Sequence, residues 1–307
     1  MTQPRISVLI NNYNYGAMLG RAIDSALAQT GPTAEVIVVD DGSSDGSRAV
    51  IEGYGAAITA IFQPNGGQAS AMNAAVRASR GEILCFLDAD DWWRAGKTAA
   101  VAAAFDADPA LGLVFHRLVP TASDGRIVNR PIPRTLCEGD LAPRMARSGG
   151  VWPFPMTSAI SVRRSAWDAA GPIPEGFRIS ADAWLVGIIP FLRRVRALPE
   201  VLGHYRIHDN TWHRADDAAM LRRRMDHWAR TVTETNAFMA GQGLHWRLDL
   251  ADHFPHRLAG ARLARIRAAQ RLTLLAHGLR FGGEPHPLRR GRDALRVLRA
   301  RPVDGAA

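Results

Sequence analysis

Residues 82–93 read Glu82-Ile83-Leu84-Cys85-Phe86-Leu87-Asp88-Ala89-Asp90-Asp91-Trp92-Trp93. The apolar first half predicts a buried strand, and three carboxylates follow that strand directly. Crowded carboxylates repel one another unless a cation lies among them, and their oxygens are the ligands that Mg²⁺ and Mn²⁺ prefer. The stretch therefore predicts a divalent-metal site at the end of a strand, with one alternative: Asp90 or Asp91 caps a helix that starts near Arg94.

The residues before this stretch alternate between strand and helix patterns. Apolar and β-branched runs predict strands at residues 6–10, 34–39 and 58–62. Apolar residues at helical spacing predict helices at 18–29, 49–53 and 70–79. Strands that alternate with helices form parallel sheets with right-handed crossovers, so we expect an α/β protein with a Rossmann-like, doubly wound and mostly parallel sheet.

Two acidic clusters follow strands of this sheet. Asp40-Asp41 ends the second strand, and residues 88–91 end the fourth. Ligands of open parallel sheets bind at the carboxyl ends of the strands, so the two clusters are expected to converge. A nucleotide diphosphate with its metal needs this arrangement: one carboxylate accepts from the base or ribose, and others hold the ion that neutralises the diphosphate.

Composition limits the class of protein. The chain has 307 residues, 47% of them hydrophobic, which is enough for one large α/β domain with an appendage or for two domains. We find neither a secretory leader pattern nor a run of about 18 apolar residues, and Cys85 and Cys137 lack metal-ligand spacing. We therefore expect a cytoplasmic protein in a reducing compartment.

Five short motifs follow one another in the first hundred residues. They are Val8-Leu9-Ile10-Asn11-Asn12-Tyr13-Asn14, Arg21-Ala22-Ile23-Asp24-Ser25-Ala26-Leu27-Ala28-Gln29-Thr30, Val38-Val39-Asp40-Asp41-Gly42-Ser43-Ser44-Asp45, Asn65-Gly66-Gly67-Gln68-Ala69-Ser70-Ala71-Met72-Asn73-Ala74 and Phe86-Leu87-Asp88-Ala89-Asp90-Asp91-Trp92. In this order and spacing the motifs resemble the nucleotide-binding half of a family 2 glycosyltransferase with the GT-A fold. The resemblance continues more loosely over residues 150–212.

The resemblance implies an activity and a donor site. A member of this family moves a sugar from a nucleotide-diphosphate donor, here preferably a UDP-sugar, to an acceptor hydroxyl with inversion, in polysaccharide or glycoconjugate assembly. Carried over position by position, Asn11 lies near the base, Asp41 accepts from the base and Asp88 faces the ribose. Asp90 would ligate the divalent metal, Mn²⁺ or Mg²⁺, with Asp91 beside it.

Further donor-side residues come from two other segments. Gln68 in the Gly-rich turn and Asn73 in the next helix could face the donor, although Asn73 could equally bond local backbone. His204-Tyr205-Arg206-Ile207-His208 resembles the Tyr-Arg-x-His segment that closes the family's core. Arg206 would then pair with diphosphate oxygens, and His208 would approach the metal or phosphate unless it is a structural loop histidine.

The catalytic base is expected in the looser second region. Inversion in one displacement demands a base that deprotonates the acceptor. Residues 156–175 resemble the acceptor-side segment, which in the family precedes a Glu-Asp pair whose Asp is the base. In this chain the pair is Ala181-Asp182, so Asp182 is the candidate, with capping of the following helix as its alternative role. Ala181 in place of Glu leaves open a protein that binds nucleotide sugar or glycan without turnover.

The C-terminal region differs in composition. Helical spacing of apolar residues extends over 218–241 and 258–279, and a short last helix is expected at 289–301. We therefore divide the chain into a catalytic domain, 1–213, and an arginine-rich helical appendage, 214–307. These arginines contribute to a formal net charge of +9. Their faces are expected either to be solvated or to rest on anionic lipid at the inner face of the membrane, which would suit a lipid-linked acceptor.

Two other classes are disfavoured. A nucleotidyltransferase would carry a Gly-rich, basic loop after the first strand, where this chain has Asn11-Asn12-Tyr13-Asn14-Tyr15-Gly16. A nucleic-acid-binding protein would suit the pI of about 10.7. However, no aromatic-and-basic interleaving, zinc spacing or recognition-helix pattern accompanies the arginines, so we expect no nucleic-acid partner.

Overall fold

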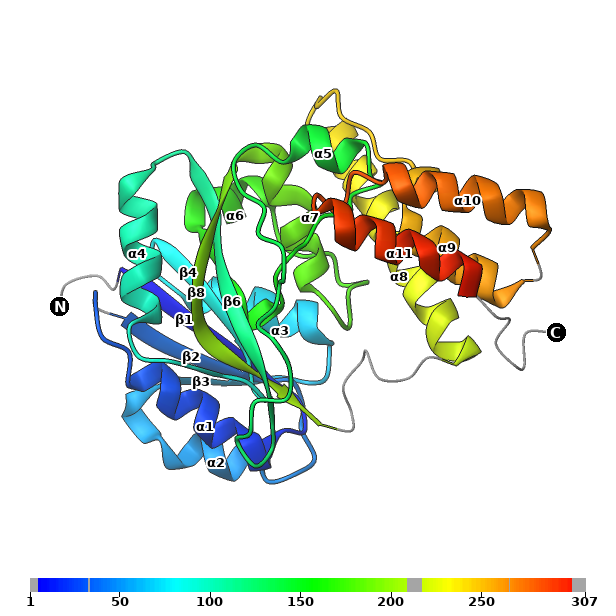
Figure 1. Cartoon of the computed structure of the whole chain (residues 1–307). Helices are drawn as coiled ribbons and strands as arrows, with labels where there is room; N and C mark the ends of the chain where they lie inside the picture. Colours follow the sequence, from blue (N-terminus) through cyan, green and yellow to red (C-terminus); the bar gives the residue numbers. More distant parts are fainter. Residues whose placement is uncertain (1–4, 33, 209–216, 265, 300–307) are drawn as a thin grey trace. The chain divides into compact units, whose positions relative to one another are not determined.

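The computed structural model describes residues 5–32, 34–208, 217–264 and 266–299. The chain divides into two compact units (Figure 1), of which the first contains residues 1–140 and 155–208 and the second contains 141–154 and 209–307. The expected boundary after residue 213 falls among residues outside the described part of the chain. None of the described helices combines the length and the apolar composition that crossing a membrane requires.

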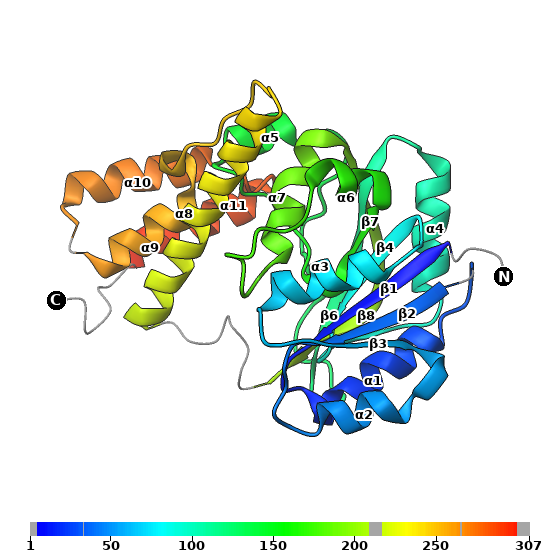
Figure 2. The same ribbon diagram turned by 180° about the vertical axis from the view of Figure 1, so that it is seen from behind.

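The first unit is built on one eight-stranded sheet. The strands are β1 (Ile6–Asn12), β2 (Ala34–Asp40), β3 (Thr59–Phe62), β4 (Ile83–Asp88), β5 (Trp92–Trp93), β6 (Leu111–Ala122), β7 (Ile160–Arg163) and β8 (Arg194–Ile207). Their order is β3-β2-β1-β4-β7-β6-β8-β5, and Figure 2 shows β3, β2 and β1 side by side. The first four in this order are parallel, which confirms the strands predicted at the N-terminus.

Helices complete both units. The first unit has α1 (Gly16–Leu27), α2 (Ser47–Gly53), α3 (Gln68–Ala78), α4 (Lys97–Ala107), α6 (Arg164–Ala170) and α7 (Asp182–Leu192). The second has α5 (Ala142–Ala146), α8 (Ala218–Gly241), α9 (Phe254–Leu263), α10 (Ala268–Arg280) and α11 (Pro287–Arg299). β1 and β4 are buried along almost their whole length, as expected for strands covered on both faces.

The structure corrects two predicted helices. The helix after the acidic stretch begins at Lys97 and not near Arg94, because Trp92–Trp93 pair with β8 and Gly96 precedes the helix in a left-handed conformation. Asp90 and Asp91 therefore cap no helix. The helix expected over 258–279 is two helices, since the backbone is extended at Ala264 and Arg267 while apolar spacing continues across the break.

Asn73 holds α3 to a segment a hundred residues further along the chain. Its Nδ2 donates to the carbonyl oxygen of Ile173 (2.8 Å), and its Oδ1 accepts from the Ile173 N–H (2.9 Å). The side chain is buried, and its carboxamide bonds both the N–H and the C=O of one residue, as the backbone of a neighbouring strand would. Asn73 therefore ties α3 to the chain that leads into α7.

We predict that Asn73→Ala destabilises the protein by about 2–4 kcal/mol, because the buried N–H and C=O of Ile173 lose their partners. Urea unfolding would measure the change in the free energy of unfolding. Asn129→Ala is the matched control, since the Asn129 side chain lies in an exposed loop and accepts from Arg130 and Arg134, which are exposed as well. Equal stabilities of the two variants would contradict this role of Asn73.

Candidate active site

An acidic cluster lies at the carboxyl end of β4. One ligand atom from each of Asp88, Asp90 and Asp91 falls within 4.8 Å of the others. β1 runs beside β4 in register, so Asn11 lies opposite Asp88 and donates from Nδ2 to Asp88 Oδ1 (3.1 Å). The other carboxamide atom, Asn11 Oδ1, is buried and has no hydrogen-bond partner among the residues that the structure describes. An acceptor left in this position suits a ligand that brings a hydroxyl or N–H donor.

The carboxylates of this cluster repel one another. Burial, together with the charges of Asp90 and Asp182, raises the pKa of Asp88 to about 7. Burial and the charges of Asp90 and Asp88 hold the pKa of Asp91 well above its usual range. A cation placed among these groups would reverse both shifts, because it favours the ionised carboxylates.

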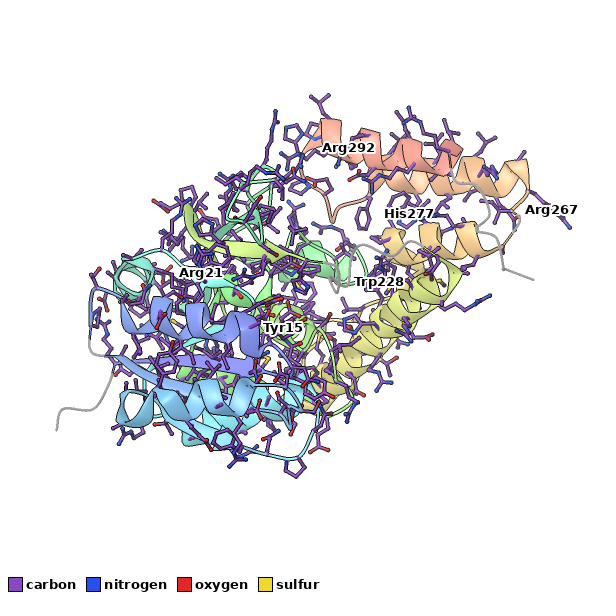
Figure 3. The ribbon with its side chains drawn as sticks, turned by 90° about the horizontal axis from the view of Figure 1, so that it is seen from below. Tyr15, Arg21, Trp228, Arg267, His277 and Arg292 are labelled. Carbon is purple, nitrogen blue, oxygen red and sulfur yellow. The ribbon has the colours of Figure 1, made fainter. Side chains whose placement is uncertain are left out.

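His208 completes a set of possible metal ligands. Its Nε2 lies 2.8 Å from Asp90 Oδ2. Its ring packs edge to face against the ring of Tyr15, with 5.6 Å between the centroids. Tyr15 lies at the start of α1 (Figure 3). Carboxylate oxygens and an imidazole nitrogen are suitable ligands for Mn²⁺, and the carboxylates alone suit Mg²⁺. The three carboxylates lie close enough together to share one ion and therefore fit a divalent metal, with the His208 ring beside Asp90.

Asp91 has a different environment from its neighbours. It is fully buried, and its two oxygens accept from the Ser158 hydroxyl (2.6 Å) and from the Arg206 N–H (2.8 Å). The Arg206 side chain donates from Nε to the carbonyl oxygen of Asp90 (2.7 Å), and its guanidinium lies over the Trp92 ring. Asp91 and Arg206 thus fix the backbone of the acidic loop against β8.

Asp182 lies at the start of α7, beside the cluster. Burial raises the pKa of its carboxyl to about 6, although hydrogen bonds from Thr157 and Ala183 act in the opposite direction. Thr157 also hydrogen-bonds to the carboxylate of Asp88, and the charge of Asp182 contributes to the raised pKa of Asp88. Two carboxyls from distant parts of the sequence therefore share one hydroxyl partner.

Gln68 also links the end of β4 to the start of α7. Its Nε2 donates to Asp88 Oδ1 (3.0 Å), while its Oε1 accepts from the backbone N–H of Ala181 (2.9 Å). The residue after Ala181 is Asp182, so one carboxamide spans the end of β4 and the start of α7. Gln68 is placed to set the distance between the acidic cluster and Asp182.

Asp41 and Asn73 form hydrogen bonds with residues outside the acidic cluster. Asp41 accepts from Gln63 Nε2 (2.7 Å) and from the N–H groups of Gly66 (2.9 Å) and Gly67 (2.7 Å). It thereby shapes the turn that leads into Gln68. Asn73 pairs with Ile173, as described above, and we leave it out of the donor site.

Three residues of the site lie in segments that carry the family resemblance, but the sequence did not predict their contacts. Ser158 accepts from the Asp88 N–H (3.1 Å) as it donates to Asp91, and Thr157 bonds Asp88 and Asp182. Tyr205 on β8 lies close enough to the carboxylates for their charges, after burial, to raise its pKa further. A Thr-Ser pair and a single tyrosine have no spacing that predicts such contacts.

Known proteins share this architecture. The family model described as glycosyl transferase family 2 matches residues 7–169. An uncharacterized glycosyltransferase of Nostoc sp. is 36% identical over 261 residues, which cover 82% of this chain and 81% of that protein.

Two solved structures share the fold. S. aureus TarS in complex with UDP-GlcNAc superposes with a TM-score of 0.59 at 17% identity, over 90% of this chain and 80% of that one. The mannosyltransferase PcManGT from Pyrobaculum calidifontis, in complex with GDP-Man and Mn²⁺, gives 0.56 at 22% identity, over 98% and 86%.

The mixed α/β sheet is that of the GT-A glycosyltransferases. The chain belongs to glycosyl transferase family 2.

We predict that Mn²⁺ raises the melting temperature of the protein, and raises it more at about pH 8 than at about pH 6. Below its pKa of about 7, Asp88 is mostly protonated and attracts a cation weakly. Without metal, we expect the melting temperature of the protein to be lower at about pH 8 than at about pH 6. A carboxyl with a raised folded-state pKa contributes stability that is complete below about pH 4 and is lost as the pH rises through about 7.

Thermal unfolding with Mn²⁺ and with EDTA at both pH values measures the two trends. Asp90→Ala should abolish the shift produced by Mn²⁺, whereas Asp124→Ala, in an exposed turn, should leave it unchanged. An undiminished shift in Asp90→Ala would place the metal elsewhere.

Proposed function

We propose that this glycosyltransferase transfers a sugar, with inversion, from a nucleotide-diphosphate donor to an acceptor hydroxyl in polysaccharide or glycoconjugate assembly. The observation that carries the proposal is the buried carboxyl of Asp182 beside a second, separate group of carboxylates at the end of β4. One group suits a base, and the other suits a metal on the leaving diphosphate.

The donor would lie along the carboxyl ends of β1, β2 and β4. A UDP-sugar is our preferred donor, since the family resemblance favours uracil and TarS has been solved with UDP-GlcNAc. Asn11 Oδ1 would accept from the nucleoside, and Asp88 would face the ribose. Asp41 would accept a hydrogen bond from the nucleotide base through a remaining lone pair, or would position the Gly-rich turn against the base.

Asp90 and His208, with Asp88, would hold Mn²⁺ or Mg²⁺, and Asp91 would anchor the loop that presents them. A bound divalent ion would neutralise the charge that the nucleoside diphosphate gains as it leaves. Arg206 lies next to this loop and adds a fixed positive charge, although its Nε is already bonded to the carbonyl oxygen of Asp90.

Asp182 would remove the proton from the acceptor hydroxyl as the oxygen attacks the anomeric carbon. Its raised pKa makes it a stronger base than an ordinary carboxylate and leaves it ionised at neutral pH. The acceptor is a glycan or a lipid-linked sugar, and a lipid-linked one would require the protein to work at a membrane surface.

Ala181 favours a second candidate, a protein that binds a nucleotide sugar without turnover. The small side chain is fully buried and adds no carboxylate beside Asp182. Its backbone N–H is nevertheless held by Gln68, so the base does not depend on a neighbouring Glu for its position.

We predict that Asp182→Asn lowers transfer by about 10²–10⁴-fold while donor binding is retained, because the amide cannot accept the hydroxyl proton. In the unchanged protein, kcat/KM should fall about tenfold per pH unit below about pH 6, where Asp182 becomes protonated. Release of nucleoside diphosphate from UDP-, GDP- and dTDP-sugars with Mn²⁺ measures both effects.

Asp168→Asn is the matched control, since Asp168 is exposed on α6. Near-normal transfer by Asp182→Asn would show that the base is another residue. Donor binding by the unchanged protein, with neither transfer nor hydrolysis of the donor, would establish the binding-protein alternative.

We predict that Gln68→Ala lowers kcat by about 10–100-fold and leaves the melting-temperature shift by Mn²⁺ in place, because it frees the start of α7 without removing a metal ligand. Steady-state kinetics and thermal unfolding separate the two effects. Gln242→Ala, at the exposed C-terminal end of α8, should keep the full kcat. An unchanged kcat in Gln68→Ala would refute a positioning role.

A further inference from the structure

The last two described helices expose large apolar side chains that the core of their unit does not use. That core contains Phe254, Leu274, Phe281 and Val297. Five leucines of α10 and α11 point elsewhere and are 49–79% exposed. We call them the leucine face: Leu272, Leu279, Leu288, Leu295 and Leu298.

The leucine face is one surface and not two. α10 and α11 pack antiparallel (Figure 1), and they are in close contact at Gly278, where an added Cβ would lie 2.8 Å from the Cβ of Ala294. Successive residues of a helix are rotated by roughly 100° about its axis. Measured from Gly278 on α10 and from Ala294 on α11, the leucines of each helix lie at roughly 40–120° around the axis, in the same rotational sense. In an antiparallel pair that sense leads to the same side.

Arginines border this surface. Arg292 and Arg299 lie next to the leucines on α11, on the edge away from α10, and Arg296 lies beyond them; Figure 3 labels Arg292. Residues 266–299 contain eight arginines and only two acidic residues, Glu284 and Asp293. Asp293 pairs with Arg292 and Arg296 in exposed ion pairs, which leaves a large excess of positive charge.

We propose that the leucine face docks on an anionic membrane, with its leucines in the boundary between headgroups and acyl chains and its arginines on lipid phosphates. A helix with an apolar face, a basic edge and low overall hydrophobicity lies in the interface plane and does not span the bilayer. Long arginine side chains at the edge reach the headgroups while their stems cover apolar surface.

The charges favour a lipid surface over a second copy of the chain. A symmetric dimer through this face would bring the arginine edges of two copies together, and like charges at an interface oppose association. An anionic membrane instead supplies a continuous apolar layer under negative charge. The docking does not depend on the transfer reaction, so it is tested without donor or acceptor.

Sedimentation of the full chain with lipid vesicles tests the proposal. The vesicles contain phosphatidylcholine alone, or with about 30% phosphatidylglycerol. We expect affinity for the mixed vesicles to be about tenfold higher, and to fall as salt is raised. The double substitution Leu288→Ser with Leu295→Ser should lower binding to mixed vesicles about tenfold or more, and Arg292→Gln with Arg299→Gln should remove the preference for anionic lipid.

Leu27→Ser is the matched control, since Leu27 is 42% exposed on α1 in the first unit and should bind as the unchanged protein does. Thermal unfolding checks that each variant is folded. Two results would overturn the proposal: equal binding of the leucine double variant and the unchanged protein, or a dimer seen by light scattering without lipid that the leucine substitutions convert to monomer.

Discussion

Mutual repulsion among buried carboxylates is the constraint around which the first unit is organised. Asp88, Asp90 and Asp91 follow one strand, and Asp182 is brought to them by α7. The protein lowers the cost of this crowding with neutral donors: Asn11 and Gln68 bond Asp88, and Ser158 bonds Asp91. Burial, and after it the repulsion that remains, raises the pKa values of Asp88 and Asp91, and a divalent cation would favour their ionised forms.

The Gly-rich turn before α3 joins the parts that must act together. Asp41 accepts from its backbone N–H groups, and Gln68 at its end bonds both Asp88 and Ala181. Gly67 has φ of +89°, and a Cβ there would lie 2.7 Å from the Cα of Arg178. The close approach lets the turn bond the chain just before α7, so a few short contacts join the end of β4 to the start of α7.

Local patterns predicted the parallel half of the sheet, because β1, β2 and β4 are apolar runs that end in polar side chains. The same patterns predicted a helix from near Arg94, with Asp90 or Asp91 as its cap, but Trp92–Trp93 form β5 and pair with β8, more than a hundred residues away. Asp88 and Asp90 could be expected at the site from their strand alone. The partners of Asp91 and Asn73 could not, since Ser158, Arg206 and Ile173 reach them only through tertiary packing.

Ala181 fits this balance of charge. A Glu at this fully buried position would add a carboxylate next to Asp182 and near Asp88, where burial already raises the pKa of both groups. An added charge would raise those pKa values further and favour the protonated form of Asp182, which could not serve as the proposed base at neutral pH. The neutral alanine adds no such charge, and its N–H is bonded to Gln68, so with a pKa of about 6 the Asp182 carboxyl stays ionised at neutral pH, as the proposed role of a base requires.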